Sequence, residues 1–340
     1  MKRLVMITTM AIAFFNVATA QISIVIQNND KVFESSKIDT IINHIEQGDT
    51  IYLPGGNIVL TGELRIDKEV HIIGAGHYPD STSATSYTHV SGSNVRFVPG
   101  SDNSSITGIN LNRDLYFGLT VDEAVSNITI SRSSLSNIYC GYGNVRNTPN
   151  NFINLRENVI RGSLNCADVQ HLLVEKNIIN GRIDNLTDNA VFRNNIFLYQ
   201  GSYSVFRTCT GITVNNNIFV RDDHGLSAST INNNLFRLNF VAVSGTNLGS
   251  GNIVNNGIDS LFVNSDGDAA FSYTTNYHLH PDCDGIGAGT DGTEIGIYGS
   301  TSPYKEGAVP FNPHIRFINI RSESENGILP VEIHVAAQEN

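Results

Sequence analysis

Short apolar alternations, each followed by an asparagine, recur along the middle of the chain. With h for an apolar residue, the pattern h-x-h-x-x-N-x-h fits residues 153–160, 172–179, 190–197 and 212–219, and a weaker copy lies at 229–236. The alternation predicts short strands with one face inside and the other in solvent. We call the asparagine position of this pattern the anchor; copies further out carry other small residues there. The anchors are Asp114, Ser133, Asn158, Asn177, Asn195, Asn217, Asn234 and Gly257.

The spacing of these anchors indicates the fold class. Successive intervals of 19, 25, 19, 18, 22, 17 and 23 residues average about 20, which is typical of solenoid coils. We therefore predict an all-β chain that forms a single right-handed parallel β-helix. Each anchor asparagine is expected at a tight bend, where its tolerance of positive φ is useful. Its amide should bond to neighbouring coils as a ladder along the solenoid.

The flanking segments predict how the solenoid ends. Residues 33–45 have apolar positions at helical spacing and are expected to form a helical cap at the N-terminal end. Residues 315–320 and 329–335 are typical of strands and predict a C-terminal hairpin. The expected organisation is a leader at 1–20, the β-helix at 21–300, and a connector with a short β extension at 301–340.

The first 20 residues have the pattern of an export signal. Lys2 and Arg3 precede the apolar run 4–15, and residues 18–20 form a small-residue cleavage site. Loss of this leader takes the formal charge from −11 to −13, and such an acidic chain is a poor partner for nucleic acid. No other apolar run is long enough to span a bilayer. We expect a monomer that is secreted to the extracellular space or periplasm, free or attached to the cell surface.

Composition supports a turn-rich β protein. The chain has 41 Asn, 30 Gly and no Trp, and asparagine favours turns over helix interiors. Four scattered cysteines are too few for a disulfide framework. Cys140 and Cys166 each lie two residues after an apolar position in adjacent predicted coils. They are expected to stack inside, either as a disulfide or as free buried thiols.

Two stretches carry a resemblance to a known family. Residues 48–56 read GDTIYLPGG and residues 70–76 read VHIIGAG, upstream of the asparagine-anchored coils. Together they resemble the right-handed parallel β-helix proteins of the pectin-lyase-like superfamily. The stretch YHLHPDCDGIGAGTDGTEIGIYG (277–299) is similar to the segment that closes the solenoid in secreted bacterial members. The resemblance covers roughly residues 30 to 300 and implies the fold, which carries lyases, hydrolases, epimerases and proteins without known catalysis.

Catalytic signatures of the family are missing. The lyase-like WxDH and RxPxxR patterns are absent, as are the basic motifs of alginate- and chondroitin-lyase-like branches. Hydrolases of the polygalacturonase-like type spread carboxylates over successive coils, because inversion needs two separated carboxyl groups. The one similar group of residues in this chain is Asp222, Asp223 and His224, which lie within a single predicted turn. These three are the catalytic candidates, and a plain polar turn is the alternative.

Ions and polyanions have weaker candidates. Asp266 and Asp268 place carboxylates in a loop, as Ca²⁺ requires, but the same Asp-Gly sequence is common in turns. No other cofactor is indicated. Arginine or lysine precedes several anchors and would form a basic stripe for a polyanion, although Glu157 and Glu175 interrupt it and exposed charges also keep edges soluble. The stripe would contain Arg113, Arg132, Arg156, Lys176 and Arg193.

The inserted loops offer the remaining ligand candidates, because binding residues concentrate in loops. Tyrosine rings there are suited to stacking on sugars, and arginine and aspartate to bonding hydroxyls or carboxylates. The ligand-binding candidates are Tyr142, Arg182, Asp184, Tyr203 and Arg207. The sequence thus favours a carbohydrate-binding or scaffolding protein whose partner is a polysaccharide or cell-surface glycan. A lyase or hydrolase of acidic polysaccharide and a structural adhesin remain alternatives.

Overall fold

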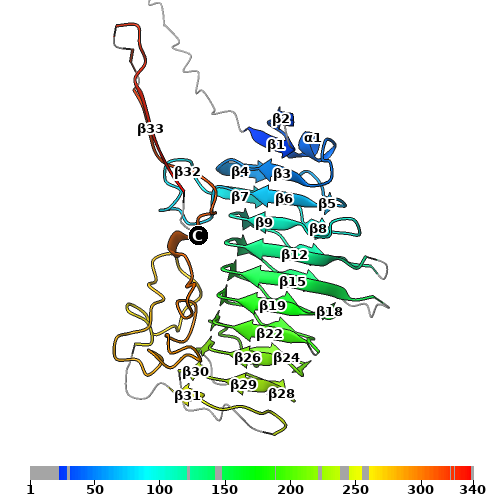
Figure 1. The fold of residues 1–340 in the computed structure, drawn as a ribbon, viewed down its shortest axis with the longest axis vertical. Coiled ribbons are helices and arrows are strands. Elements are labelled where there is room, and N and C mark those ends of the chain that lie inside the picture. Colours follow the sequence, from blue (N-terminus) through cyan, green and yellow to red (C-terminus); the bar gives the residue numbers. More distant parts are fainter. Residues whose placement is uncertain are drawn as a thin grey trace, which may run out of the picture.

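The chain folds into a parallel β-solenoid, as the repeat predicts (Figure 1). The computed structural model describes residues 23–28, 31–120, 123–141, 148–187, 189–220, 224–237, 245–254, 260–321, 323–324 and 326–337. Within these residues the first sheet has nine parallel strands, which correspond to about nine turns. The leader predicted at 1–20 lies outside the described residues.

Three sheets form the walls of the solenoid. The first contains β3 (Asp49–Tyr52), β6 (Val70–Ile73), β9 (Ser105–Thr107), β12 (Ser126–Ser131), β15 (Asn150–Arg156), β19 (Leu172–Glu175), β22 (Ala190–Arg193), β26 (Thr213–Asn215) and β29 (Thr230–Asn232), with β18 (Val169–Gln170) beside β15. The second contains β4 (Gly56–Val59), β7 (Thr88–Ser91), β10 (Asn110–Leu111), β13 (Ser134–Leu135), β16 (Val159–Ile160), β20 (Ile178–Ile179), β23 (Ile196–Phe197), β27 (Ile218–Phe219), β30 (Leu235–Phe236) and β31 (Ile253–Val254). The third contains β5 (Leu64–Ile66), β8 (Val95–Phe97), β11 (Leu115–Phe117), β14 (Ile138–Cys140), β17 (Leu164–Asn165), β21 (Ile183–Asp184) and β24 (Phe206–Arg207); β25 (Cys209–Thr210) pairs separately with β28 (Leu226–Ser227).

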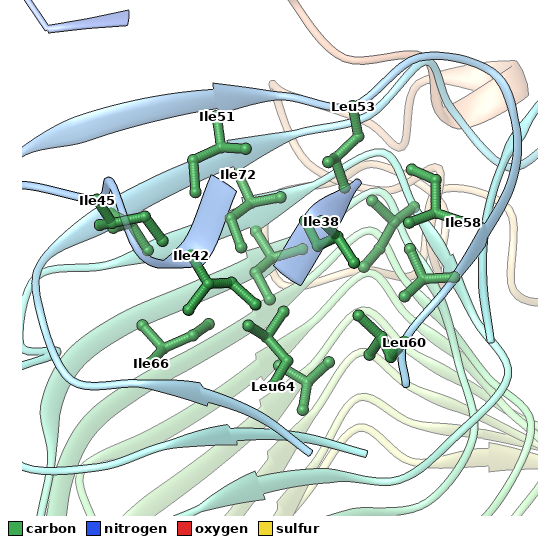
Figure 2. Close-up of a pocket in the computed structure, with 15 residues that line it drawn as sticks. Ile38, Ile42, Ile45, Ile51, Leu53, Ile58, Leu60, Leu64, Ile66 and Ile72 are labelled. Atoms are coloured by element: carbon green, nitrogen blue, oxygen red, sulfur yellow. The ribbon is translucent and has the colours of Figure 1, made fainter. Parts of the chain in front are cut away.

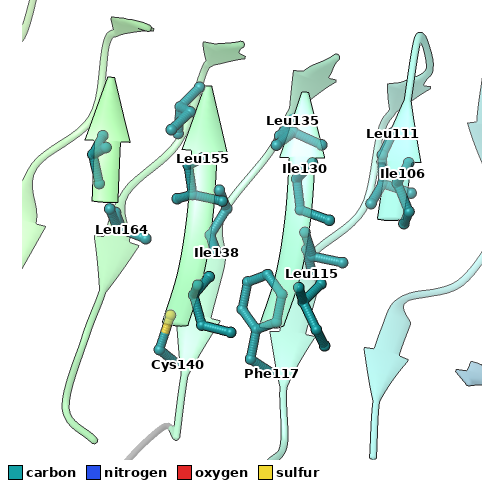
Figure 3. Close-up of a cluster of buried hydrophobic side chains, with 14 of the residues drawn as sticks. Ile106, Leu111, Leu115, Phe117, Ile130, Leu135, Ile138, Cys140, Leu155 and Leu164 are labelled. Atoms are coloured by element: carbon teal, nitrogen blue, oxygen red, sulfur yellow. The ribbon is translucent and has the colours of Figure 1, made fainter. Parts of the chain in front are cut away.

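Inward side chains stack coil upon coil and fill the interior. Phe97 lies parallel to Phe117 with ring centroids 5.5 Å apart, and Phe219 stacks on Phe236 at 4.9 Å. Figure 3 shows Cys140 in the same layer of apolar groups. Because the strands are parallel and in register, each inward residue meets the residue one coil away. The core is therefore a continuous column, as expected for a solenoid.

The asparagine ladder lies at the corner between the first and second sheets and is confirmed. Each anchor from Asn158 to Asn234 donates its backbone N–H to the side-chain oxygen of the next anchor at 2.8–3.0 Å. Its Nδ2 donates to a backbone carbonyl of the preceding coil at 2.8–2.9 Å. The amides thus satisfy buried backbone groups that the corner leaves without a strand partner.

Three details of the predicted ladder are corrected by the structure. The anchor after Asn234 is Asn252, whereas Gly257 lies outside the described residues. Asp114 belongs to another corner, where its backbone N–H donates to Asn94 Oδ1 at 3.2 Å. Positive φ occurs one residue before each anchor and not at the anchor, because that residue turns the chain while the anchor side chain points inward. These corner residues are Arg132, Glu157, Lys176, Asn194, Asn216 and Asn233.

The N-terminal end does not show the helical cap predicted over 33–45. Residues 31–35 form β2 (Lys31–Ser35), which pairs antiparallel with β1 (Ile24–Asn28), and the helix α1 covers only Ile38–Ile42. β-Branched residues have low helix propensity, and this short stretch contains four of them. Figure 2 shows Ile38 and Ile42 over an interior space in the first coils. This space has a volume of about 20 Å³ and an entirely apolar lining, so no polar ligand fits it.

After β31 the chain turns back along the outside of the second sheet (Figure 1). We call residues 260–313 the return segment; it includes the short 3-10 helix η1 (Glu306–Ala308). Residues 260–300, predicted as part of the β-helix, thus pack against coils instead of forming them. The corner residues hold this segment in reverse order: Asn233 donates to Ala288 O, Asn216 to Thr290 Oγ1, Asn194 to Gly296 O, Lys176 to Ser302 O and Arg132 to Val309 O.

Burial under the return segment removes the predicted basic stripe. Arg132 and Lys176 are 1% and 5% exposed, and Arg132 Nε donates to Glu157 Oε2 at 2.7 Å. Glu175 lies in register between two further arginines, Arg156 and Arg193, and accepts from the latter at 2.7 Å. The charges therefore alternate along this edge and compensate one another. Arg113, the other predicted member, lies at the corner that carries Asp114 and is exposed.

The predicted C-terminal hairpin is confirmed. β32 (His314–Ile320) and β33 (Val331–Ala336) pair antiparallel and project away from the solenoid (Figure 1). Ile318, Ile333 and Val335 of this hairpin are exposed.

Candidate functional site

One outward-facing line of polar and aromatic side chains runs along the third sheet. Its strands are parallel and in register, so each coil contributes one member directly above the next. Coils lie about 4.8 Å apart, so seven members extend over about 29 Å. The members of this third-sheet row are Arg65, Arg96, Tyr116, Tyr139, Asn165, Asp184 and Arg207.

The N-terminal end of the row contains two arginines that share one carboxylate. Glu123 is 7% exposed and accepts from Arg65 Nη1 and Arg96 Nε, each at 3.2 Å. Burial favours the neutral carboxyl, but hydrogen bonds from Arg96 and from the backbone N–H groups of Leu119 and Thr120 lower the pKa of Glu123 to about 2. Both arginines are thus compensated by an anion that stays ionised at neutral pH.

Two tyrosines occupy the centre of the row. Tyr116 and Tyr139 stack with ring centroids 4.9 Å apart and planes 11° apart. Burial and the neighbouring Asp114 carboxylate raise the pKa of Tyr116 to about 12, so its phenol stays protonated. Because the ring faces cover one another, the pair presents edges and hydroxyl groups to solvent.

At the C-terminal end the structure brings four predicted ligand residues together. Asp184 is 4% exposed; it accepts from Arg182 Nε at 2.7 Å and from Arg207 Nε at 2.8 Å. The Arg182 guanidinium lies 5.4 Å from the ring centre of Tyr203, whose residue is 65% exposed. The fifth candidate, Tyr142, lies outside the described residues. The outer edges of Arg207 and Tyr203 are the accessible groups of this cluster.

The catalytic candidates divide between described and undescribed residues. Asp222 and Asp223 lie outside the described residues. His224 is 3% exposed, and its Nδ1 accepts the backbone N–H of Leu226 at 3.0 Å. A general base must reach a substrate proton, and this imidazole is enclosed by its own coil. Catalysis at this turn remains a prediction.

The calcium candidates face a cation of the protein. Arg237 Nη2 donates to Asp268 Oδ2 at 2.8 Å and lies 3.6 Å from Asp266. Hydrogen bonding from Arg237 lowers the pKa of Asp268. In the part of the chain that the structure describes, no group of three His, Cys, Asp or Glu side chains is arranged to hold a metal ion. Calcium binding at this loop remains a prediction.

Cys140 ends β14, Cys166 directly follows the neighbouring strand β17, and both are free thiols in the core. Burial, with the adjacent thiol of Cys140, raises the pKa of Cys166. The reduced form is one of the two states expected from the sequence, and such a protonated thiol is a weak nucleophile.

The repeat itself contains a signal for the return segment. The position after each anchor asparagine faces outward, yet it is apolar in five successive coils: Val159, Ile178, Ile196, Ile218 and Leu235. All five are buried. Earlier coils carry Asn57, His89, Asn110 and Ser134 at this position. The switch from polar to apolar marks where the cover packs through apolar side chains, whereas Ser134, the last polar member, is buried as well.

Comparison with known proteins adds no functional assignment: the chain matches no protein-family model and no curated protein. Among the described residues no helix is long and apolar enough to cross a membrane. The fold and the third-sheet row are therefore the features that bear on function.

Proposed function

We propose that this protein is a secreted solenoid that binds a polysaccharide or cell-surface glycan along the third-sheet row. The observation that carries the proposal is the unbroken register of hydrogen-bonding and aromatic side chains over seven coils. A line of evenly spaced donors and acceptors suits an extended polymer that lies along the solenoid axis. The sequence resemblance to the pectin-lyase-like superfamily supports carbohydrate as the ligand, although fold alone does not assign function.

The charges of the row favour a neutral glycan. Arg182 and Arg207 are paired with Asp184, and Arg96 is paired with Glu123 and Glu63. A uronate would have to compete with these carboxylates and approach a leaderless chain of formal charge −13. Hydroxyl groups of a neutral sugar accept and donate at the free edges without breaking an ion pair.

The same pairing disfavours a polysaccharide hydrolase at the row. Asp184 accepts hydrogen bonds from the guanidinium groups of Arg182 and Arg207, which occupy its carboxylate oxygens. Glycoside hydrolysis needs a protonated acid and a second carboxylate across the scissile bond. We therefore favour glycan binding over catalysis, and both over a purely structural role. A negative binding experiment would instead support a structural adhesin without glycan affinity.

The proposal is tested by screening the leaderless protein on an array of neutral and uronate-containing glycans. We expect binding to neutral polymers that changes little with salt, because few charges are released. Binding restricted to uronates would contradict the neutral preference, and absence of signal on all glycans would contradict the binding function itself. Assays for sugar release and for unsaturated products on the same panel would detect the enzymatic alternative.

Point variants then locate the surface. Tyr139→Ala and Arg207→Ala should each weaken binding of the best array ligand by about 3- to 10-fold. Phe152 provides a matched control, because it is a half-exposed ring stacked at 4.7 Å on His171 but lies on the first sheet. Phe152→Ala should leave affinity unchanged. Equal losses in all three variants would remove the third-sheet row as the binding surface.

A further inference from the structure

A pocket lined by five tyrosines lies between the return segment and the outside of the solenoid. Its rings are Tyr78, Tyr273, Tyr277, Tyr298 and Tyr304, which we call the tyrosine pocket. Ile178 of β20 also lines it, and Thr274, Thr275, Asn276, Glu306 and Gly307 complete the lining. The volume is about 250 Å³, slightly below the range of about 300–1,000 Å³ for drug-sized ligands. It is therefore suited to a small headgroup.

The rings are fixed by contacts with one another. Tyr78 meets Tyr273 edge to face, with centroids 4.8 Å apart and planes at 76°. Tyr298 and Tyr304 form a second perpendicular pair at 6.0 Å and 86°. A hydrogen bond of 3.0 Å between the hydroxyl groups of Tyr78 and Tyr304 joins the two pairs. These contacts hold the rings around the pocket that they line, and a lining of several aromatic rings is the composition of an aromatic cage.

The electrostatics of the pocket favour a cation. Burial raises the pKa of Tyr78, Tyr298 and Tyr304 well above the usual range, so these phenols stay neutral. Among the lining residues Glu306 is the one charged group, and its side chain is 74% exposed. Arg161 affects the pKa of Tyr273 through its charge but does not line the pocket. Neutral ring faces and a carboxylate both attract positive charge.

His278 holds the carboxylate beside the cage. Its ring stacks on Tyr298 with centroids 3.6 Å apart, and its Nε2 lies 3.1 Å from Glu306 Oε1. Glu294 approaches the other ring nitrogen at 4.0 Å, and burial raises the pKa of Glu294. The surroundings of Tyr298 thus contain two carboxyl groups and one imidazole.

We propose that the tyrosine pocket binds a small organic cation of the quaternary ammonium class. Methyl groups of such a cation contact ring faces, while the diffuse charge interacts with the ring quadrupoles and with Glu306. A long polysaccharide exceeds the volume of about 250 Å³, and a compact anion has no cationic partner among the lining residues. This site is separate from the third-sheet row, so the proposal of cation binding does not depend on the proposal of glycan binding.

The first experiment titrates choline into the leaderless protein by calorimetry, beside 3,3-dimethylbutan-1-ol, its uncharged analogue of the same shape. Choline should bind at least about 10-fold more tightly, because both ligands fill the cage but only one interacts with the ring quadrupoles. Equal affinities would show a merely apolar pocket. Absence of saturable binding up to about 50 mM choline would overturn the proposal.

Point variants distinguish a loss of choline affinity caused by removal of a ring from a loss caused by general destabilisation of the protein. Tyr273→Leu should weaken choline binding about 10-fold, whereas Tyr273→Phe keeps the ring and should bind within about 2-fold of the parent. Glu306→Gln should cost about 3-fold at low salt and less at high salt. Phe152→Leu, at the half-exposed ring on the first sheet, is the matched control and should leave choline affinity unchanged. If Tyr273→Phe loses binding as fully as Tyr273→Leu, the hydroxyl and not the ring face holds the ligand, and the proposal fails.

Discussion

The outer faces of the second and third sheets differ in burial, although the same coils form both sheets: the first of these faces is covered and the other is accessible. On the second sheet, Ile178, Ile196 and Ile218 point outward and are buried beneath Ile295, Ile297 and other residues of the return segment. On the third sheet, the outward positions carry Tyr116, Tyr139 and Asn165, which stay partly exposed. An apolar wall requires a cover, whereas a polar wall remains accessible to a ligand. The difference explains why the candidate binding surface lies on one wall only.

The strongest test of this difference is to introduce the same residue, asparagine, at an outward position of each wall. Ile218→Asn would bury an amide without partners in an apolar layer and remove side-chain volume. It should lower the free energy of unfolding by about 4 kcal/mol. Tyr139→Asn on the open wall should cost about 1 kcal/mol, because the amide remains hydrated. Urea unfolding at neutral pH measures both values.

The control for this pair is protease sensitivity of the return segment. Ile218→Asn should increase cleavage within 260–313, because its apolar contacts are weakened, and Tyr139→Asn should not. Equal destabilisation by the two substitutions would show that the second sheet does not depend on its cover.

The solenoid was predictable because its signals are local and repeated. Each coil restates the same alternation, so Asn158, Asn177 and Asn195 indicate one corner without knowledge of any distant contact. The return segment involves single, non-repeated contacts between residues far apart, such as Arg132 with the carbonyl of Val309. No periodicity predicts such a pair. Only the apolar residue after each anchor, for example Ile196 or Ile218, hinted at a covered wall.

The two walls should also differ in the pH range over which they lose stability. On the covered side, burial and secondarily the charge of Arg161 lower the pKa of His77 from 6.5 to about 3. Because the unfolded chain binds this proton more readily, the folded state keeps its full stability above pH 6.5 and loses about 5 kcal/mol as pH falls toward 3. On the open side, Glu123 has a pKa lowered from 4.5 to about 2. Its contribution is present above pH 4.5 and lost toward pH 2, by about 2 kcal/mol because solvent screens part of the attraction from the half-exposed Arg65.

Urea midpoints measured from pH 7 to pH 2.5 distinguish these contributions. His77→Phe should flatten the decline between pH 6.5 and about pH 5.5, where Glu123 is ionised in both the folded and the unfolded state. Glu123→Gln should leave that interval unchanged and reduce the decline below pH 4.5. If Glu123→Gln instead flattens the upper interval, the assignment of the two groups to the two walls is wrong.

The candidate site was predictable only in part, for a physical reason. Arg182, Asp184, Tyr203 and Arg207 come from two adjacent coils, so sequence spacing alone places them close together. Their mutual compensation depends on rotamers, as does the face-to-face contact of Tyr116 with Tyr139. The tyrosine pocket combines residues near position 78 with others beyond 270 and has no signal in the repeat.

The smallest predicted effect concerns what the two walls share. Val90 of the second sheet and Val95 of the third both line the interior space of about 20 Å³ in the first coils. Val90→Ile and Val95→Ile each add one methylene to this apolar volume and should raise the free energy of unfolding by about 0.5–0.8 kcal/mol. Because the walls differ outside and not inside, the two gains should agree within error of paired thermal and urea unfolding. A loss of stability in either variant would mean that the local packing cannot accept the added group, and a gain in only one would show that the walls differ on their inner faces as well.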